Sequence, residues 1–176
     1  MAIETERLLL RTPAEADFVE LQRMHADPLM HRYLGGPATA EDEYWRGARE
    51  RWAAHHREHG FGLWATVRKD DGRLLGRVGL LSQEVDGERH VEVAYALSPE
   101  FWGRGYALEA ARACRDWAFH TLDVPHLVSL ILPANERSIR VAERNGMTFW
   151  KEADFKEYRV RVYRITRAEW QALATG

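Results

Sequence analysis

A short glycine turn in the middle of the chain has the residue types that bind a phosphate group. Gly103, Arg104 and Gly105 lead directly into a run in which apolar residues recur with helical spacing as far as Phe119. The first turn of a helix leaves its N–H groups unpaired, and the helix dipole favours an anion there. Glycine lets the backbone approach such an anion closely. The same pattern also occurs in ordinary loops between strands and helices, so a phosphate site and a structural turn both remain open.

Two well-known nucleotide-binding motifs do not fit this turn. A Walker A loop needs Lys and then Ser or Thr after its second glycine, whereas Tyr106 and Ala107 follow Gly105. The dinucleotide fingerprint G-x-G-x-x-G needs a third glycine where Leu108 stands. The turn is therefore neither a P-loop nor a dinucleotide-binding loop.

The composition indicates one globular domain over residues 1–176. Hydrophobic residues make up 45% of the chain and charged residues 30%, which allows a sizeable core. The 25 basic and 27 acidic residues are interspersed, so the charge does not predict a nucleic-acid-binding surface. The amino terminus has no signal-peptide pattern, and no apolar run approaches the length of a membrane span. We therefore expect a cytoplasmic protein that binds no membrane.

The cysteine and histidine residues do not form a metal-binding pattern. Cys114 is the single cysteine and lies on the apolar face of the expected helix, where we expect a small core residue rather than a nucleophile. Among the eight histidines, His55 and His56 are adjacent rather than four residues apart, and no cysteine or carboxylate accompanies them at ligand spacing. The sequence therefore predicts no metal site.

A sheet must position the glycine turn, and the chain alternates strand-like and helix-like segments that can build one. The near-continuous apolar run at 126–132 is typical of a parallel strand, and the turn at 69–72 is typical of a hairpin. The order of segments predicts an α+β fold, a mixed sheet with helices packed on it. We expect strands over 8–11, 61–68, 74–82, 90–97, 126–132, 147–151 and 155–165, and helices over 12–25, 41–56, 103–121, 135–145 and from 166 onward.

Capping residues mark several of the expected helix ends. Thr12 precedes a proline at the first helical position and a glutamate three residues on, which predicts a helix start. Asn135 is a favourable N-cap, and Gly146 suits a left-handed residue after the helix end. Thr166 begins a second T-x-x-E capping box.

Three segments, in order, resemble the GNAT family of acyl-CoA N-acyltransferases, in the branch typified by ribosomal-protein N-terminal acetyltransferases. The segments are 4–11, 91–107 and 135–147, and the resemblance covers nearly the whole chain. It implies the GNAT fold, with a central twisted mixed sheet that is splayed between its fourth and fifth strands. It also implies acetyl-CoA as co-substrate, no metal, and a primary amine as acceptor, either a peptide N-terminus or a small molecule. A homodimer remains open.

The resemblance assigns the coenzyme to the glycine turn and to the strand before it. The strand is implied to pair with the pantetheine arm and to bind the thioester oxygen as it gains charge, through Tyr95, Ala96 and Leu97. Asn135 is implied to bond the same arm, although a plain helix cap is its alternative role. Trp102 replaces a frequent Gln or Arg, which is usual in this branch. The implied pyrophosphate-binding N–H groups are those of Gly103, Arg104, Gly105, Tyr106, Ala107 and Leu108.

Glu92 and Ser138 are the catalytic candidates. At pH 7.5 roughly a third of an α-amine is free base, so a carboxylate acting through water is sufficient help. The resemblance points to Glu92, which strand alternation places on the face of Ala94 and Ala96; its alternative is a solvent-facing glutamate. Ser138 is the provisional proton donor to the leaving thiolate, and alternatively satisfies the helix backbone. Many family members carry a tyrosine acid where alignment puts Ala142.

The amine pocket is implied to be built by the segment between the first two helices and by the last strands. Aromatic residues there are also common in cores, so a core role remains open for most of them. Two other functions remain open: a coenzyme A-binding sensor or regulatory domain without turnover, and transfer of a longer acyl group. The candidate pocket residues are Met30, His31, Tyr33, Leu34, Trp45, Trp64, Phe155 and Tyr158.

Overall fold

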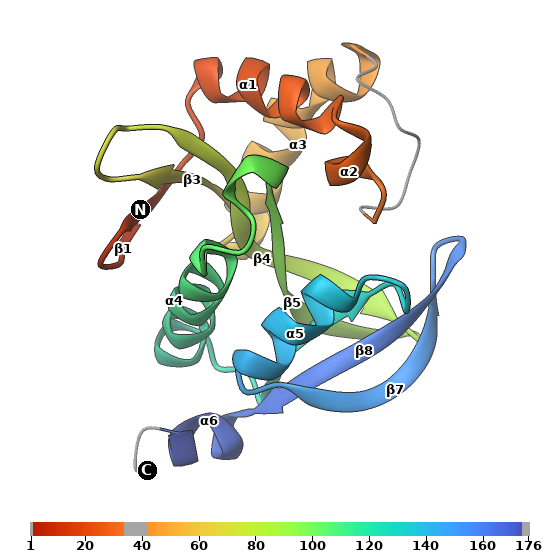
Figure 1. Cartoon of the computed structure of the whole chain (residues 1–176). Coiled ribbons are helices and arrows are strands. Elements are labelled where there is room, and N and C mark those ends of the chain that lie inside the picture. The colour runs from red at the N-terminus through yellow and green to blue at the C-terminus, as the bar shows by residue number, and fades with distance from the viewer. Residues whose placement is uncertain (1, 34–41, 174–176) are drawn as a thin grey trace.

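The computed structural model describes residues 2–33 and 42–173, and its centre is an eight-stranded mixed sheet (Figure 1). The strand order is β1-β2-β3-β4-β5-β6-β8-β7. Neighbouring strands are antiparallel except β5 and β6, which are parallel as the apolar run at 126–132 predicted. The strands are β1 (Ala2–Glu4), β2 (Leu8–Arg11), β3 (Leu63–Arg68), β4 (Leu74–Val85), β5 (Glu88–Leu97), β6 (His126–Ile131), β7 (Thr148–Phe155) and β8 (Tyr158–Thr166).

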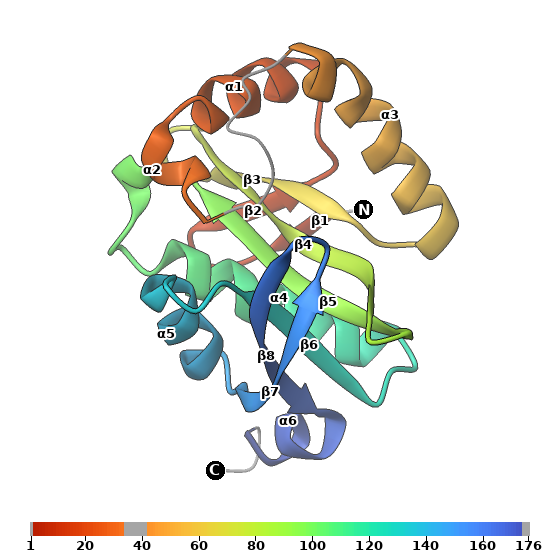
Figure 2. The same ribbon diagram turned by 90° about the vertical axis from the view of Figure 1, so that its right-hand side faces the viewer.

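The helices cover both faces of this sheet, which confirms the α+β prediction. Figures 1 and 2 show α1, α2 and α3 together at one end of the molecule and α6 at the opposite end. The sequence pattern did not predict β1 or the one-turn helix α2. The helices are α1 (Glu15–His25), α2 (Pro28–His31), α3 (Asp42–His59), α4 (Tyr106–Thr121), α5 (Glu136–Arg144) and α6 (Arg167–Leu173), with a 3-10 turn at Pro99–Phe101.

Most of the expected caps are confirmed, but the first one is wrong. Helix α1 starts after Ala14, not Thr12, because the buried Asp17 carboxylate accepts the Ala14 N–H at 2.6 Å and is paired with Arg11. The side chain of Asn135 accepts the Ser138 N–H at 3.2 Å, as expected for an N-cap. Gly146 has a φ of 87°, and Thr166 forms its expected capping box.

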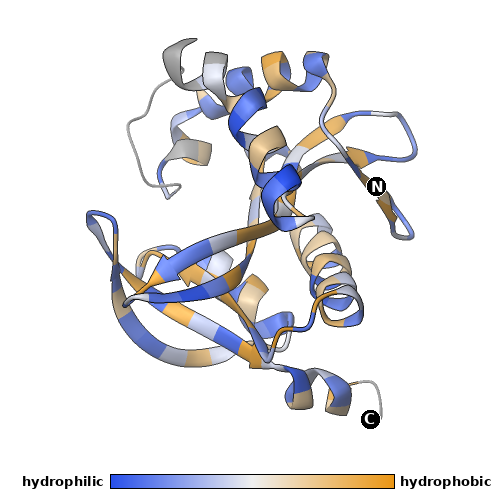
Figure 3. Cartoon of the chain, turned by 180° about the vertical axis from the view of Figure 1, so that it is seen from behind, coloured by the Kyte–Doolittle hydropathy of each residue, from blue (hydrophilic) through white to orange (hydrophobic). Residues whose placement is uncertain are grey.

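Strand alternation divides the core between the two faces of the sheet, and Figure 3 shows the strands banded in hydrophobic and hydrophilic colours. Val93 and Leu97 of β5 pack in the cluster that contains the apolar face of α4. Ala96, between them, packs in a second cluster with residues of α1 and α3. The small side chains of α4, including buried Cys114, let this helix lie close to the sheet.

The sheet is splayed at one position, between β5 and β6. β4 and β5 are paired along ten residue pairs, from Gly76–Leu97 to Val85–Glu88. β5 and β6 share a single pair, Glu92 with Val128, within the part of the chain that is described. The edge of β5 beyond Glu92 is therefore free of strand pairing, which agrees with the splay expected between the fourth and fifth strands of the sequence analysis.

Candidate functional site

A cavity of about 690 Å³ lies where the carboxyl end of β5, the glycine turn, α5 and α2 meet. The glycine turn follows β5 closely in the sequence, whereas α2 and α5 come from distant parts of the chain; β5, α2 and α5 are labelled in Figure 1. Every predicted coenzyme-binding residue except Arg104 lines this cavity. The lining residues on β5 and the turn are Tyr95, Ala96, Leu97, Gly103 and Gly105; Tyr106, Ala107 and Leu108 of α4 and Asn135 at the start of α5 complete the predicted set.

The glycine turn exposes main-chain groups to the cavity. Gly103 and Gly105 have φ values of 73° and 82°, a region that other residues rarely adopt. A Cβ added at Gly103 would meet no atom within 4 Å, so there is open space beside this glycine. Helix α4 begins directly afterwards at Tyr106, and its first-turn N–H groups have no partners within the helix. This geometry suits an anion with several oxygens.

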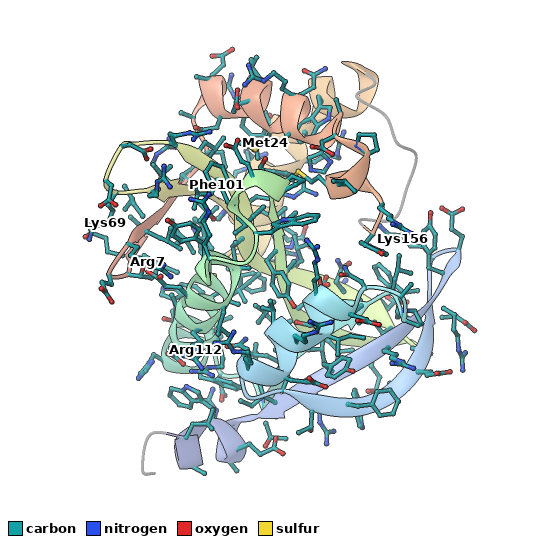
Figure 4. All side chains as sticks on the ribbon, viewed as in Figure 1. Arg7, Met24, Lys69, Phe101, Arg112 and Lys156 are labelled. Carbon is teal, nitrogen blue, oxygen red and sulfur yellow. The ribbon has the colours of Figure 1, made fainter. Side chains whose placement is uncertain are left out.

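A network on the far side of the glycine turn holds it in place. Arg7 donates to the carbonyl of Arg104 at 3.0 Å, and its guanidinium lies 4.5 Å from the ring centre of Tyr106. Glu109 accepts from Arg7 and from the Thr5 hydroxyl. Burial disfavours the charged form of Glu109, but these bonds outweigh it and lower the pKa of the carboxyl. Figure 4 shows Arg7 beside the first strands, on the opposite side of the molecule from Lys156.

The open edge of β5 presents the main-chain groups of alternate residues. The carbonyl of Val93 accepts from the Ser129 hydroxyl on β6 at 2.8 Å, and that of Leu97 accepts from the Trp102 indole at 2.7 Å. The Ser98 N–H points the other way, to Leu75 on β4. Alternation therefore directs the main chain of Tyr95 toward the open side. The main chain of Ala96, by contrast, points toward β4, where this residue pairs with Arg77.

Arginine side chains give the cavity a positive lining that the sequence analysis missed. No Asp or Glu is among its described lining residues. Three of the arginines belong to α5, and their spacing of three and four residues puts them on one face of this helix, a pattern that is visible in the sequence. Arg137 also stacks over the ring of Trp102, with 4.7 Å to its centre. A lining of this kind attracts a polyphosphate. The arginines are Arg32, Arg137, Arg140 and Arg144.

Glu92 is buried at the base of the splay and is not among the residues that line the cavity. Its side chain is 9% exposed, so the alternative of a solvent-facing glutamate is wrong. Gln83 donates to one carboxylate oxygen at 2.9 Å, and the Leu130 N–H approaches the other at 3.4 Å. Burial raises the pKa of Glu92 above its usual value, which these bonds only partly offset. A carboxylate with a raised pKa is suited to accept a proton near neutral pH.

Ser138 and the phenol of Tyr95 lie together in the cavity. The Tyr95 hydroxyl donates to the Ser138 carbonyl at 2.8 Å and so joins β5 to the first turn of α5. Burial, and to a lesser degree the charge of Glu92, raises the pKa of Tyr95. Ala142 has only a methyl side chain, so that position supplies no proton donor, and it is fully buried. The family resemblance points only to the main chain of Tyr95, because the contact of its hydroxyl depends on the packing of α5.

The predicted amine-pocket residues do not gather at one place. Met30 and Tyr33 of the α2 region line the cavity. Trp45 and Trp64 are 5% and 0% exposed within the core and do not line it, so their packing is that of core residues. Phe155 and Tyr158 are half-buried against a separate apolar cluster of β6–β8. The side chain of His31 and the whole of Leu34 lie outside the described residues.

No helix within 2–33 or 42–173 has the length and apolarity needed to cross a membrane. No three His, Cys, Asp or Glu side chains in those ranges come together as a set that could hold a metal ion.

Known proteins of one family resemble this chain in sequence and in fold. Residues 7–148 match the family model described as an acetyltransferase (GNAT) domain. The chain is 34% identical over 149 residues to the protein YkkB of Bacillus subtilis (strain 168), covering 84% of this chain and 85% of that protein. A crystal structure of an acetyltransferase from Agrobacterium tumefaciens str. C58 superposes with a TM-score of 0.81 at 35% identity, over 94% of each chain. A ribosomal L7/L12 α-N-protein acetyltransferase, RimL, solved in complex with coenzyme A, has the same fold, with a TM-score of 0.78 at 18% identity over 94% of this chain and 98% of that one.

Proposed function

The chain belongs to the GNAT acetyltransferase family and is an acyltransferase, and from this premise we propose that it transfers an acetyl group from acetyl-CoA to a primary amine. The acceptor is a protein N-terminus or a small-molecule amine, which attacks directly in a ternary complex. The observation that supports this most is the cavity that joins an open glycine turn to an unpaired strand edge. A glycine turn alone, or an unpaired strand edge alone, would be compatible with a purely structural role.

The residues of the cavity fit each part of acetyl-CoA. The N–H groups from Gly103 to Leu108 and the arginine lining suit the phosphates. The main chain of Tyr95 suits the amides of the pantetheine arm, whereas the Leu97 carbonyl already accepts from the Trp102 indole. Asn135 has an amide side chain at the cavity wall and can exchange its capping bond for one to the same arm. The bound coenzyme supplies a reactive thioester.

The chain must then stabilise charge and move protons. The Tyr95 N–H lies on the open edge and is the donor we assign to the thioester oxygen. We assign Glu92 the role of base, acting through water because its carboxylate does not itself line the cavity; its raised pKa suits that task. We assign Ser138 as the proton donor to the leaving thiolate, because it lines the cavity and Ala142 offers no acid.

The lack of an acid at Ala142 also favours a second candidate, a coenzyme A-binding sensor or regulatory domain without turnover. One experiment separates the two functions. Purified protein is titrated with acetyl-CoA by calorimetry, and release of free thiol is then followed with a panel of peptides, amino acids and polyamines. Thiol release above the hydrolysis background with one class of amine supports the transferase. Tight binding without release from any amine supports the sensor, and absence of binding contradicts both.

A further inference from the structure

Two side-chain contacts close the splay between β5 and β6 just beyond its last main-chain pair. The first is the bond from the Ser129 hydroxyl on β6 to the Val93 carbonyl on β5, at 2.8 Å. The second is the contact of the Leu130 N–H on β6 with the Glu92 carboxylate on β5, at 3.4 Å. We call these two contacts the strand clasp. They replace the ladder bonds that the diverging strands no longer make.

The strand clasp closes the splay from both faces of the sheet. Ser129 follows Val128, the partner of Glu92, so it shares a face with Val93. Glu92 lies on the opposite face, where Gln83 braces its carboxylate at 2.9 Å. Ser129 is 2% exposed and Glu92 is 9% exposed, so neither side chain is free to move into solvent. Packed side chains of this kind do not yield space without cost.

The cavity ends where the strand clasp begins. On β5 its lining includes Tyr95, Ala96 and Leu97 and no residue nearer the clasp, and none of its described lining residues belongs to β6. Val93, two residues before Tyr95, already has its carbonyl occupied by Ser129. A thioester oxygen bound at the Tyr95 N–H therefore lies two residues along β5 from the Val93 carbonyl, which Ser129 already occupies.

We propose that the strand clasp limits the acyl group to acetyl, with Ser129 as the specificity-determining residue. This inference rests on the proposed function, because it needs the thioester to lie beside Tyr95. The acyl carbon chain continues from the thioester toward the closed end of the splay. There the Ser129 side chain, the Val93 carbonyl and the buried Glu92 carboxylate occupy the volume that further methylene groups require. Two ligands that differ by one methylene group in such a pocket are discriminated by a factor of about 10–200.

The test compares coenzyme A, acetyl-CoA, propionyl-CoA and butyryl-CoA by titration calorimetry, so no acceptor has to be known. The wild-type protein should bind butyryl-CoA at least about tenfold more weakly than acetyl-CoA. Ser129→Gly removes the hydroxyl and its Cβ, and should bring the two affinities within about threefold, while binding of coenzyme A itself stays unchanged. Ser129→Thr keeps the hydroxyl donor and adds a methyl group, so this variant should bind propionyl-CoA more weakly than the wild type does.

A matched control is Thr66→Ala, which removes a fully buried hydroxyl from β3 in the same sheet. It should leave the order of acyl-CoA affinities unchanged. Circular dichroism and thermal unfolding check that each variant is folded, and Ser129→Ala replaces the glycine variant if that one is not. Equal binding of acetyl-CoA and butyryl-CoA by the wild type, or an unchanged ratio in every folded Ser129 variant, overturns the inference. Failure of all four ligands to bind instead contradicts the proposed function.

Discussion

Replacing Gly105 by valine should abolish coenzyme binding while the chain remains folded. Gly105 has a φ of 82°, and a residue with a Cβ pays roughly 1–2 kcal/mol for that conformation. An added Cβ would meet only the Arg7 guanidinium, at 3.4 Å, which is an ordinary contact. Domains of this size have unfolding free energies of about 5–15 kcal/mol, so the variant should fold.

The loss of binding comes from the backbone, because the added Cβ points toward Arg7, on the far side of the turn from the cavity. Hydrogen bonds to a charged group contribute about 1.5–3 kcal/mol each. If relief of the positive φ turns two main-chain N–H groups away from the phosphate, the loss is about 3–6 kcal/mol, which corresponds to roughly 10²- to 10⁴-fold weaker binding. Titration calorimetry with coenzyme A measures this change directly, and thermal unfolding of the same samples measures stability.

Gly72→Val is a matched control for the backbone cost. Gly72 has a φ of 70° in the β3–β4 turn, its added Cβ would meet nothing within 4 Å, and it does not line the cavity. This variant should lose a similar amount of stability and keep the affinity for coenzyme A. A folded Gly105→Val protein that binds coenzyme A within about threefold of wild type would refute the reasoning, as would equal loss of binding in both variants.

Three other outcomes are expected. Burial raises the pKa of Glu92 above 4.5, so the kcat of the wild type should fall as the pH drops through that raised value. The Glu92→Gln variant should have a lower kcat at neutral pH and should lack this fall on the acid side. Identical pH–rate profiles for the two proteins would exclude Glu92 as the base. His55 is bonded to the Phe61 carbonyl through Nδ1 and accepts the Ser82 N–H at Nε2, and burial lowers its pKa. Because the unfolded chain then binds the proton more tightly, the unfolding free energy should fall as pH drops below about 6.5. Urea unfolding at pH 7.5 and 5.5 should show a smaller fall in His55→Gln, and an equal fall would contradict this. Burial raises the pKa of the Cys114 thiol, so Ellman's reagent should label the native protein only after unfolding, and fast labelling would disagree.

Local features of the chain were predictable from sequence because short-range chemistry decides them. The glycine turn, the helix from Tyr106 to Thr121, the Asn135 cap and the left-handed Gly146 each depend on a few neighbouring residues. The predicted start of α1 was wrong because the cap of this helix depends on the Arg11–Asp17 contact as well as on the local pattern. The family resemblance supplied the splay, which no local pattern contains.

The tertiary structure decided which of the candidate side chains reach the cavity. Trp64 and Tyr33 are both aromatic in the sequence, yet packing buries the first completely in the core and leaves the second in the cavity wall. Glu92 likewise could not be distinguished from a solvent-facing residue until its burial and its contact with Leu130 were seen. The order of residue types determines backbone conformation and the periodicity of faces, since these depend on neighbours along the chain. Which face meets which, and what fills the space between two diverging strands, depends on residues such as Glu92 and Ser129 that lie far apart in the sequence and meet only in the folded chain.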